Sequence, residues 1–324
     1  MARVPAPEGR HNERLDNASS NHDRHLNFVS AHAQQRDLDY IMKKLIVILG
    51  PTAVGKTAYA IQLAKTLGTE IISADSRQIF KELNIGAARP SEDEQREAKH
   101  HFIASASIHD EYSAGRFERE ALEKLHELFA QHDTVVCCGG SMMYLDALVN
   151  GFDDLPSDKT VREHWSKRFV EEGIEALQRE LEGKDPDYYT QVDIHNPHRL
   201  IRALEVCTVS GMPYSSLRKA NGMERNFAVE KIGLEMPREQ LYDRINTRVL
   251  RMMEEGLLEE ARGLYPFKQL QALNTVGYKE LFDYFDGHCS LEDAIQKIQQ
   301  HTRNFAKRQL TWWRRDTQIT WHQI

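Results

Sequence analysis

Eight consecutive residues have the composition of a phosphate-binding loop. They match the pattern G-x-x-x-x-G-K-[ST] and are Gly50, Pro51, Thr52, Ala53, Val54, Gly55, Lys56 and Thr57. The glycines let backbone N–H groups turn toward an anion at a helix N-terminus, the lysine supplies a mobile cation, and the Thr57 hydroxyl can bind Mg²⁺. The loop predicts a diphosphate- or nucleotide-binding site with Mg²⁺; the alternative is a glycine-rich turn that only links a strand to a helix.

A carboxylate that most proteins with this loop require is missing. Kinases and NTPases of the class hold Mg²⁺ with an acid at the end of a later apolar strand. The best candidate strand, 134–138, runs instead into Gly139, Gly140 and Ser141. This departure favours an unusual use of the phosphate loop, while a small-molecule or nucleoside kinase with a replacement acid stays open.

Asp75 is the carboxylate that the pattern places nearest to the phosphate loop. It follows the second predicted strand and precedes Ser76, Arg77 and Gln78. Because the carboxyl ends of parallel strands form one ligand-binding edge, we expect Asp75 to lie within reach of the phosphates. It could serve as a base, as a metal ligand or as the cap of a following helix, and the sequence leaves these roles open.

The hydrophobic pattern indicates the elements that hold these loops. An apolar run at 45–49 without polar alternation predicts a strand buried on both faces, as in a parallel sheet. Further strands are expected at 70–74, 134–138 and 228–234, and helices at 58–67, 116–131, 238–263 and 291–314. Amphipathic, charged segments replace the strand pattern between 155 and 217. We therefore expect a P-loop NTPase-like α/β core, 43–154 with 218–324, interrupted by a helical insertion domain at 155–217.

Composition narrows the class of protein. The 324 residues carry a formal charge of −7, which argues against general coating of nucleic acid, so any RNA contact should be a local basic patch. The four scattered cysteines predict no disulfide framework, and no apolar run reaches the about 18 residues of a membrane span. Residues 1–42 are polar and expected to be disordered, with Met42 a candidate start. The expected location is the cytoplasm.

Three more motifs occur further along the chain. They are GGSMMY at 139–144, NPHRLIRALE at 196–205 and TVGYK at 275–279. Together with the phosphate loop and the DSRQ segment at 75–78, in this order and spacing, they resemble the tRNA dimethylallyltransferase family over about 43–315. No single later motif is decisive, whereas the ordered set is highly specific.

The resemblance implies transfer of a dimethylallyl group from its diphosphate to the N6 amine of adenosine 37, beside the tRNA anticodon. Asp75 would take the amine proton, because that amine is a poor nucleophile until a base assists it. Arg248 would bind the diphosphate, its alternative being a solvated arginine on an amphipathic helix. Ser141 stands where the family usually has threonine and would contact the target nucleotide, cap the next helix, or do both.

The resemblance also implies an RNA surface that binds the anticodon stem-loop, with the adenine extruded into a tunnel. The matching residues are Asp75, Ser76, Arg77, Gln78, Ser141, Arg162, His198, Arg199, Leu200, Ile201, Arg202, Asn274, Thr275, Val276, Gly277, Tyr278 and Lys279. For Arg199 and Arg202 the alternative is an ion pair with Glu205, and for the basic C-terminal helix with its two tryptophans it is core packing. A monomer without an obligate protein partner is expected. A tRNA-binding protein with a vestigial nucleotide site is the non-catalytic rival.

Overall fold

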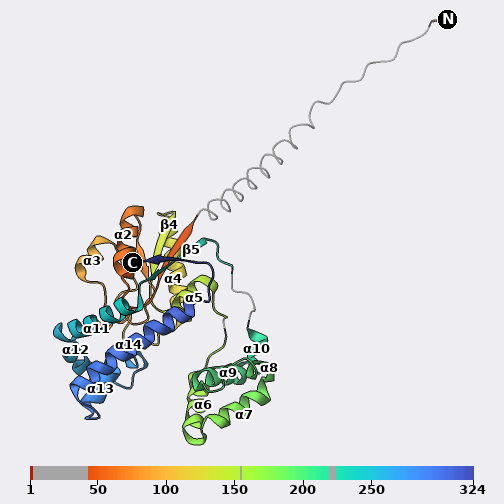
Figure 1. Cartoon of the computed structure of the whole chain (residues 1–324). Helices are drawn as coiled ribbons and strands as arrows, with labels where there is room; N and C mark the ends of the chain where they lie inside the picture. The colour runs from red at the N-terminus through yellow and green to blue at the C-terminus, as the bar shows by residue number, and fades with distance from the viewer. Residues whose placement is uncertain (3–42, 154, 219–223) are drawn as a thin grey trace.

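The computed structural model describes residues 1–2, 43–153, 155–218 and 224–324, and its core is one parallel sheet (Figure 1). Six strands lie in the order β3-β2-β4-β1-β5-β6, and every pair of neighbours is parallel. Their bounds are β1 Lys44–Leu49, β2 Ile71–Ser73, β3 His100–His101, β4 Thr134–Cys138, β5 Ala228–Glu235 and β6 Ile319–Gln323. The expected parallel α/β core is confirmed.

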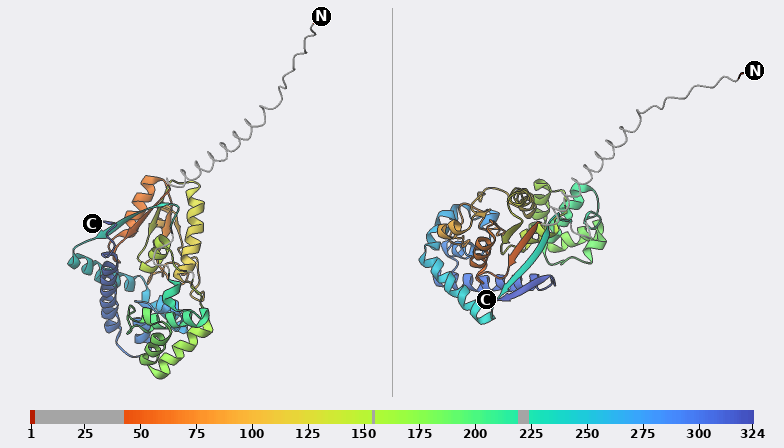
Figure 2. Two further views of the ribbon diagram at one scale, coloured as in Figure 1. Left: turned by 90° about the vertical axis from the view of Figure 1, so that its right-hand side faces the viewer. Right: turned by 90° about the horizontal axis from the view of Figure 1, so that it is seen from above.

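Helices cover both faces of this sheet, as Figure 2 shows. Alternate side chains of a strand point to opposite faces, so Ile46 and Ile48 of β1 pack with α2 (Lys56–Leu67). Leu45 and Val47 pack on the other face with α4 (Ala114–Phe129) and α5 (Met142–Asn150). Because β1 is buried on both faces, its apolar run lacks the alternation of a half-exposed strand.

Four helices follow in the described C-terminal part of the chain. They are α11 (Arg238–Glu254), α12 (Leu257–Leu264), α13 (Tyr278–Phe285) and α14 (Leu291–Trp313), with the short turns η1 (Tyr265–Phe267) and η2 (Gln271–Leu273). Helices α11 and α14 share a buried cluster with the sheet, and α12 and α13 belong to a second cluster. The prediction of a single helix over 238–263 was wrong. Gly256 adopts a left-handed conformation with φ 104°, which ends α11 and starts α12 in a new direction. The short α3 (Glu92–Glu97) lies earlier, between β2 and β3.

The inserted segment is helical and has a core of its own. It contains α6 (Lys159–Glu172), α7 (Ile174–Lys184), α8 (Pro186–Tyr189), α9 (Pro197–Ser210) and α10 (Tyr214–Leu217). Trp165, Leu177 and Leu204 belong to its buried cluster, which includes no strand residue. Figure 1 shows these helices gathered apart from the sheet. The division at 155 and 217 into separate domains stays a prediction.

Two expectations concern the chain ends and the membrane. The disorder expected over residues 1–42 falls, apart from Met1 and Ala2, outside the described residues. Among the helices that the structure does describe, none combines the length and the apolar character needed to cross a bilayer. The strand β6 was not expected, because its exposed and half-buried residues lack a continuous apolar run.

Candidate active site

The phosphate loop lies at the carboxyl end of β1 and leads into the N-terminus of α2. Gly50 has φ 146°, and a Cβ built on it would stand 2.5 Å from the Leu234 carbonyl oxygen, so only glycine fits there. Gly55 caps α2 in a left-handed conformation with φ 110°. The backbone therefore turns tightly enough to direct N–H groups of the loop and of the first helical turn toward one point.

Lys56 folds back over this loop. Its Nζ donates to the carbonyl oxygens of Gly50 at 2.9 Å and Pro51 at 2.8 Å. Burial lowers the pKa of Lys56 to about 8, while nearby Cys138 and Asp75 act in the opposite direction and Arg248 adds to the decrease. An anion bound in the loop would favour the charged ammonium and could draw it away from the two carbonyl groups.

Asp75 faces the same point from the end of β2. Its Oδ1 accepts hydrogen bonds from the backbone N–H groups of Arg77 at 2.9 Å and Gln78 at 3.3 Å, which closes a turn. Its Oδ2 has no hydrogen-bond partner among the described residues. A Cβ built on Gly140 would lie 3.8 Å from Oδ2 and 3.9 Å from Lys56 Nζ, so carboxylate and ammonium converge beside this glycine. The helix-capping alternative was therefore wrong, because residues 76–79 form a turn and not a helix; Oδ1 closes that turn, and Oδ2 remains available for chemistry.

The Gly-Gly-Ser loop packs directly on the end of β2. The Ser141 N–H donates to the Ala74 carbonyl at 3.2 Å. Ser141 also occupies the N-cap position of α5, but its hydroxyl makes no capping hydrogen bond. Helix capping by this hydroxyl was thus a wrong alternative, and the half-buried side chain stays free to meet a ligand.

Two arginines of α11 reach the phosphate loop. Arg248 Nη1 lies 3.4 Å from Thr52 Oγ1, and burial lowers the pKa of Arg248 against the opposing effect of Asp75. The solvated-arginine alternative is therefore wrong. Arg244 was missed, although its Nη2 is 3.8 Å from a Cβ built on Gly55. The signal was the spacing: residues four apart lie on one face of a helix.

Gln309 of α14 was also missed. It is fully buried, and its amide bonds to Thr52 of the phosphate loop and to Gly140. Ala306 and Trp313 on either side of it are buried core residues of the same helix face. A polar residue at a core position is the signal that could have found it, because buried amides require hydrogen-bond partners.

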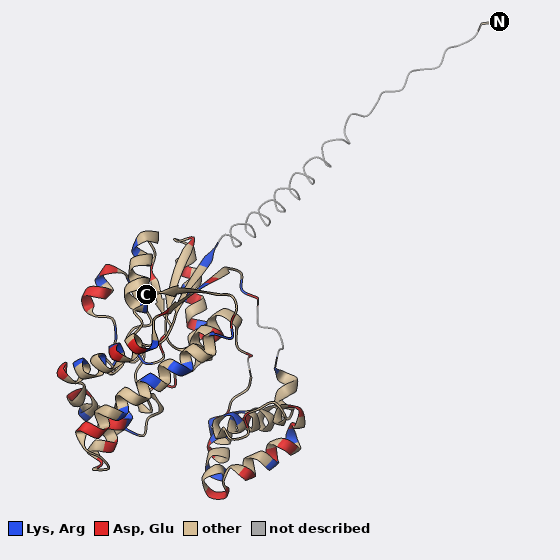
Figure 3. Ribbon diagram, in the orientation of Figure 1, with Lys and Arg blue, Asp and Glu red and all other residues tan. Residues whose placement is uncertain are grey.

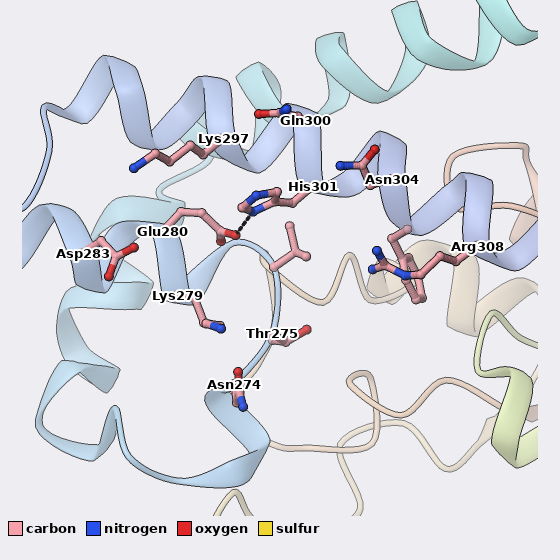
Figure 4. Close-up of a pocket in the computed structure, with 12 residues that line it drawn as sticks. Asn274, Thr275, Lys279, Glu280, Asp283, Lys297, Gln300, His301, Asn304 and Arg308 are labelled. Atoms are coloured by element: carbon pink, nitrogen blue, oxygen red, sulfur yellow. Dashed lines mark hydrogen bonds and ion pairs between the residues drawn. The ribbon is translucent and has the colours of Figure 1, made fainter. Parts of the chain in front are cut away.

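A pocket of about 620 Å³ opens between α13 and α14 (Figure 4). Asn274, Thr275, Val276 and Lys279 line one side of it. The facing residues of α14 are Lys297, Gln300, His301, Asn304, Phe305 and Arg308. Figure 4 shows the His301 ring joined to Glu280 of α13, with Nδ1 2.6 Å from Oε1. The pocket thus presents amides and cations, which hydrogen-bond to phosphates and base edges, together with the carboxylates of Glu280 and Asp283.

Comparison with known proteins decides the family. A family model described as IPP transferase matches residues 78–316. The chain belongs to the tRNA dimethylallyltransferase family. It is 54% identical over 281 residues to the tRNA dimethylallyltransferase of Christiangramia forsetii, covering 86% of this chain and 93% of that one. It is 49% identical over 281 residues to tRNA dimethylallyltransferase 1 of Bacteroides thetaiotaomicron, covering 86% and 91%.

Solved structures agree with this family. The tRNA isopentenylpyrophosphate transferase of Bacillus halodurans is 36% identical with a TM-score of 0.63, over 87% of this chain and 90% of that one. A eukaryotic dimethylallyltransferase, described as acting on tRNA, is 25% identical with a TM-score of 0.74, over 87% and 74%. The expected family and fold are thereby confirmed.

Several residues that the family resemblance assigned to RNA are used inside the fold of this dimethylallyltransferase homologue. Arg77 Nη1 donates to the Ala272 carbonyl at 3.0 Å, and Gln78 Nε2 donates to the Ala88 carbonyl at 3.0 Å. Tyr278 is fully buried, and its hydroxyl donates to Glu260 at 2.6 Å. The burial of the Tyr278 side chain contradicts the prediction that it contacts RNA directly. Gly277 beside it is buried as well.

The insertion divides the remaining predicted RNA residues into two groups. His198 and Arg199 are exposed at the start of α9, whereas the side chains of Leu200 and Ile201 are buried in the helical core. Arg162 and Arg202 lie within 3.1 and 2.9 Å of the fully buried Glu205. The ion-pair alternative is thus correct for Arg202; the Glu205 pairs do not include Arg199.

The C-terminal helix combines core and basic character. Trp313 is 4% exposed within the main core, and Trp312 packs against the same cluster, so core packing is the correct interpretation of the pair. Figure 3 shows Lys and Arg spaced along α14, whose stretch from 303 to 313 carries no acid. This face remains a basic surface beside the pocket.

The residues present fit a magnesium ion that would take most of its oxygen ligands from a bound diphosphate and water, and few from the protein. Thr57 stands in the first turn of α2, and its hydroxyl has no hydrogen-bond partner among the described residues. In those same parts of the chain, no group of three His, Cys, Asp or Glu side chains could hold a metal alone. Mg²⁺ suits such a site, because it commonly takes one or two protein oxygens together with phosphate and water.

Proposed function

We propose that this protein transfers a dimethylallyl group from dimethylallyl diphosphate to N6 of adenosine 37 in tRNA, in the cytoplasm. The observation that carries the proposal is the convergence of the Asp75 Oδ2 carboxylate oxygen and the Lys56 ammonium beside Gly140, each within 4 Å of one point. A base therefore faces a diphosphate-type anion site across a short gap, as the substitution requires. Membership of a family whose relatives are named tRNA dimethylallyltransferases supports the same reaction.

The reaction balances with the groups present. The adenine amine attacks the allylic carbon, the new N–C bond forms, and the C–O bond to the diphosphate breaks with its electron pair leaving on oxygen. Asp75 Oδ2 takes the proton that the amine loses, while Oδ1 stays fixed by Arg77 and Gln78. The phosphate-loop N–H groups, Lys56 and Arg248 stabilise the growing negative charge. Thr57 would hold Mg²⁺, which supplies further neutralisation of the diphosphate.

The RNA-facing residues support an extended anticodon loop as the second substrate. Asn274, Thr275 and Lys279 line the pocket between α13 and α14, and His198 and Arg199 are exposed on the insertion. Ser141, whose hydroxyl makes no capping hydrogen bond, directly follows Gly140, beside which Asp75 and Lys56 converge. These residues provide sites for the loop and for its extruded adenine.

The test is direct incorporation of label. Purified protein is incubated with Mg²⁺, labelled dimethylallyl diphosphate and an anticodon stem-loop carrying adenosine at position 37, and the digested nucleosides are identified. N6-dimethylallyladenosine is the expected product, and a stem-loop with guanosine at that position is the control. Absence of labelled RNA together with phosphorylation of a small molecule by ATP would instead establish a kinase. RNA binding without any product would establish the non-catalytic rival.

A further inference from the structure

One buried side chain of α14 connects the two loops that carry the reacting groups. Gln309 is 0% exposed. Its Oε1 accepts a hydrogen bond from the Thr52 N–H at 2.8 Å, and its Nε2 donates to the Gly140 carbonyl at 2.8 Å. A single amide therefore satisfies one peptide group of the phosphate loop and one of the Gly-Gly-Ser loop.

The chemistry of this bridge is specific to glutamine. Oε1 of the side chain must accept a hydrogen bond while Nε2 donates one, and a carboxylate or a thioether of similar length cannot do both. Gly140 completes the fit, because a Cβ built on it would stand 2.8 Å from Gln309 Nε2. A buried N–H or carbonyl group without a hydrogen-bond partner destabilises the folded state, so both loops are more stable when they contact the Gln309 amide.

The bridge lies where the reaction geometry is decided. Thr52, held through its N–H, is also the residue whose hydroxyl meets Arg248. Gly140, held through its carbonyl, is the point on which Asp75 and Lys56 converge. The distance from the diphosphate site to the base therefore depends on the contact that Gln309 makes with both loops.

We propose that Gln309 is a positioning residue that holds the phosphate loop and the Gly-Gly-Ser loop at the separation needed for prenyl transfer. This inference rests on the proposed function and deepens it. Gln309 touches no reacting atom; it acts through Thr52 and Gly140. The preceding residue, Arg308, lines the pocket between α13 and α14, so the same turn of α14 also borders the proposed RNA site.

The experiment compares Gln309→Met with Gln299→Met. Gln299 lies on the same helix, is half-buried, and donates one hydrogen bond to the Asn246 carbonyl at 3.3 Å, away from both loops. Steady-state kinetics with dimethylallyl diphosphate and the stem-loop are combined with calorimetric binding of inorganic pyrophosphate without RNA. Gln309→Glu is added, because it keeps the acceptor for Thr52 but loses the donor to Gly140.

We expect Gln309→Met to lower kcat by about 10²-fold, as a misplacement near 1 Å does, while KM for the stem-loop changes less than about twofold. Pyrophosphate affinity should fall by about tenfold, because the phosphate loop loses its fixed position. Gln309→Glu should lose kcat at least as severely, and Gln299→Met should match the wild type in each measurement.

Two results would overturn the inference, and a third separates it from the proposed function. Gln309→Met with wild-type kcat and pyrophosphate affinity would show that the loops hold their separation alone. Equal losses in stem-loop and pyrophosphate binding, recovered on cooling, would reduce Gln309 to a general stabilising role. Wild-type protein that makes no prenyladenosine would refute the proposed function, and unequal pyrophosphate affinities of the two methionine variants would still identify Gln309 as the loop bridge.

Discussion

Replacing Asp75 by asparagine separates its chemical role from its structural one. In the wild type, Oδ1 accepts two backbone hydrogen bonds and Oδ2 faces Gly140 with no described partner. Asparagine keeps a carbonyl oxygen for the turn but replaces the second oxygen with an NH₂ group that cannot take a proton. Loss of a general base costs about 10²- to 10⁴-fold in rate, or about 2.7 to 5.4 kcal/mol of activation free energy.

The assay is single-turnover prenylation of the stem-loop, with stem-loop affinity and thermal unfolding measured in parallel. Asp75→Asn should lose this rate and keep both affinity and melting temperature. Asp75→Ala should lose the same rate and also some stability, because two N–H groups of the turn lose an acceptor worth about 0.5 to 1.5 kcal/mol each. If Asp75→Asn transfers the prenyl group within about threefold of the wild-type rate, Asp75 is not the base.

Three further perturbations test other parts of the site. Burial lowers the pKa of Lys56 to about 8, so its ammonium is present below that pH and lost above it. Pyrophosphate affinity, measured by calorimetry, should therefore fall between about pH 7 and about pH 9 in the wild type. The fall should be less steep in Lys56→Arg, because arginine stays charged over this range. Arg248→Ala should raise KM for dimethylallyl diphosphate by about 10- to 100-fold with stem-loop KM unchanged, since a charged hydrogen bond contributes about 1.5 to 3 kcal/mol; an unchanged KM would remove Arg248 from the diphosphate site. Replacing both Arg162 and Arg202 with alanine leaves the buried Glu205 carboxylate unpaired and should cost about 3 to 5 kcal/mol in thermal unfolding, whereas adding Glu205→Gln to that variant should restore most of the loss.

Local motifs and sheet rules explain what could be predicted from the sequence. The phosphate loop is a contiguous pattern, so its residues identify it without any knowledge of the fold. Asp75 is less obvious, but the rule that strand ends share an edge brings it to the loop once a parallel sheet is accepted. Arg248 was predicted from the family resemblance, and the helical spacing of four residues would have added Arg244.

Contacts between distant segments could not be predicted in this way. Gln309 is 257 residues from Thr52 and 169 residues from Gly140, and no periodicity links such positions. The break at Gly256 was missed because a glycine within an amphipathic pattern is tolerated in many helices, and only the left-handed backbone marks an end. Burial of Tyr278 and Leu200 likewise depends on which helices pack against them, and the motifs that contain these residues carry no information about that packing.

The missing strand-end acid now has a steric explanation. Kinases and NTPases with this loop carry a carboxylate at the end of a strand beside it. In this chain the corresponding position at the end of β4 is Gly139, where a Cβ would stand 2.1 Å from the Ala74 carbonyl oxygen. No side chain fits there, so a carboxylate cannot approach from β4. The acid comes instead from the next strand, where Asp75 directs one oxygen to the gap beside Gly140. The close packing of β2 on β4 thus removes the acid position used for phosphoryl transfer and supplies a carboxylate facing the loop, an arrangement suited to a diphosphate that leaves.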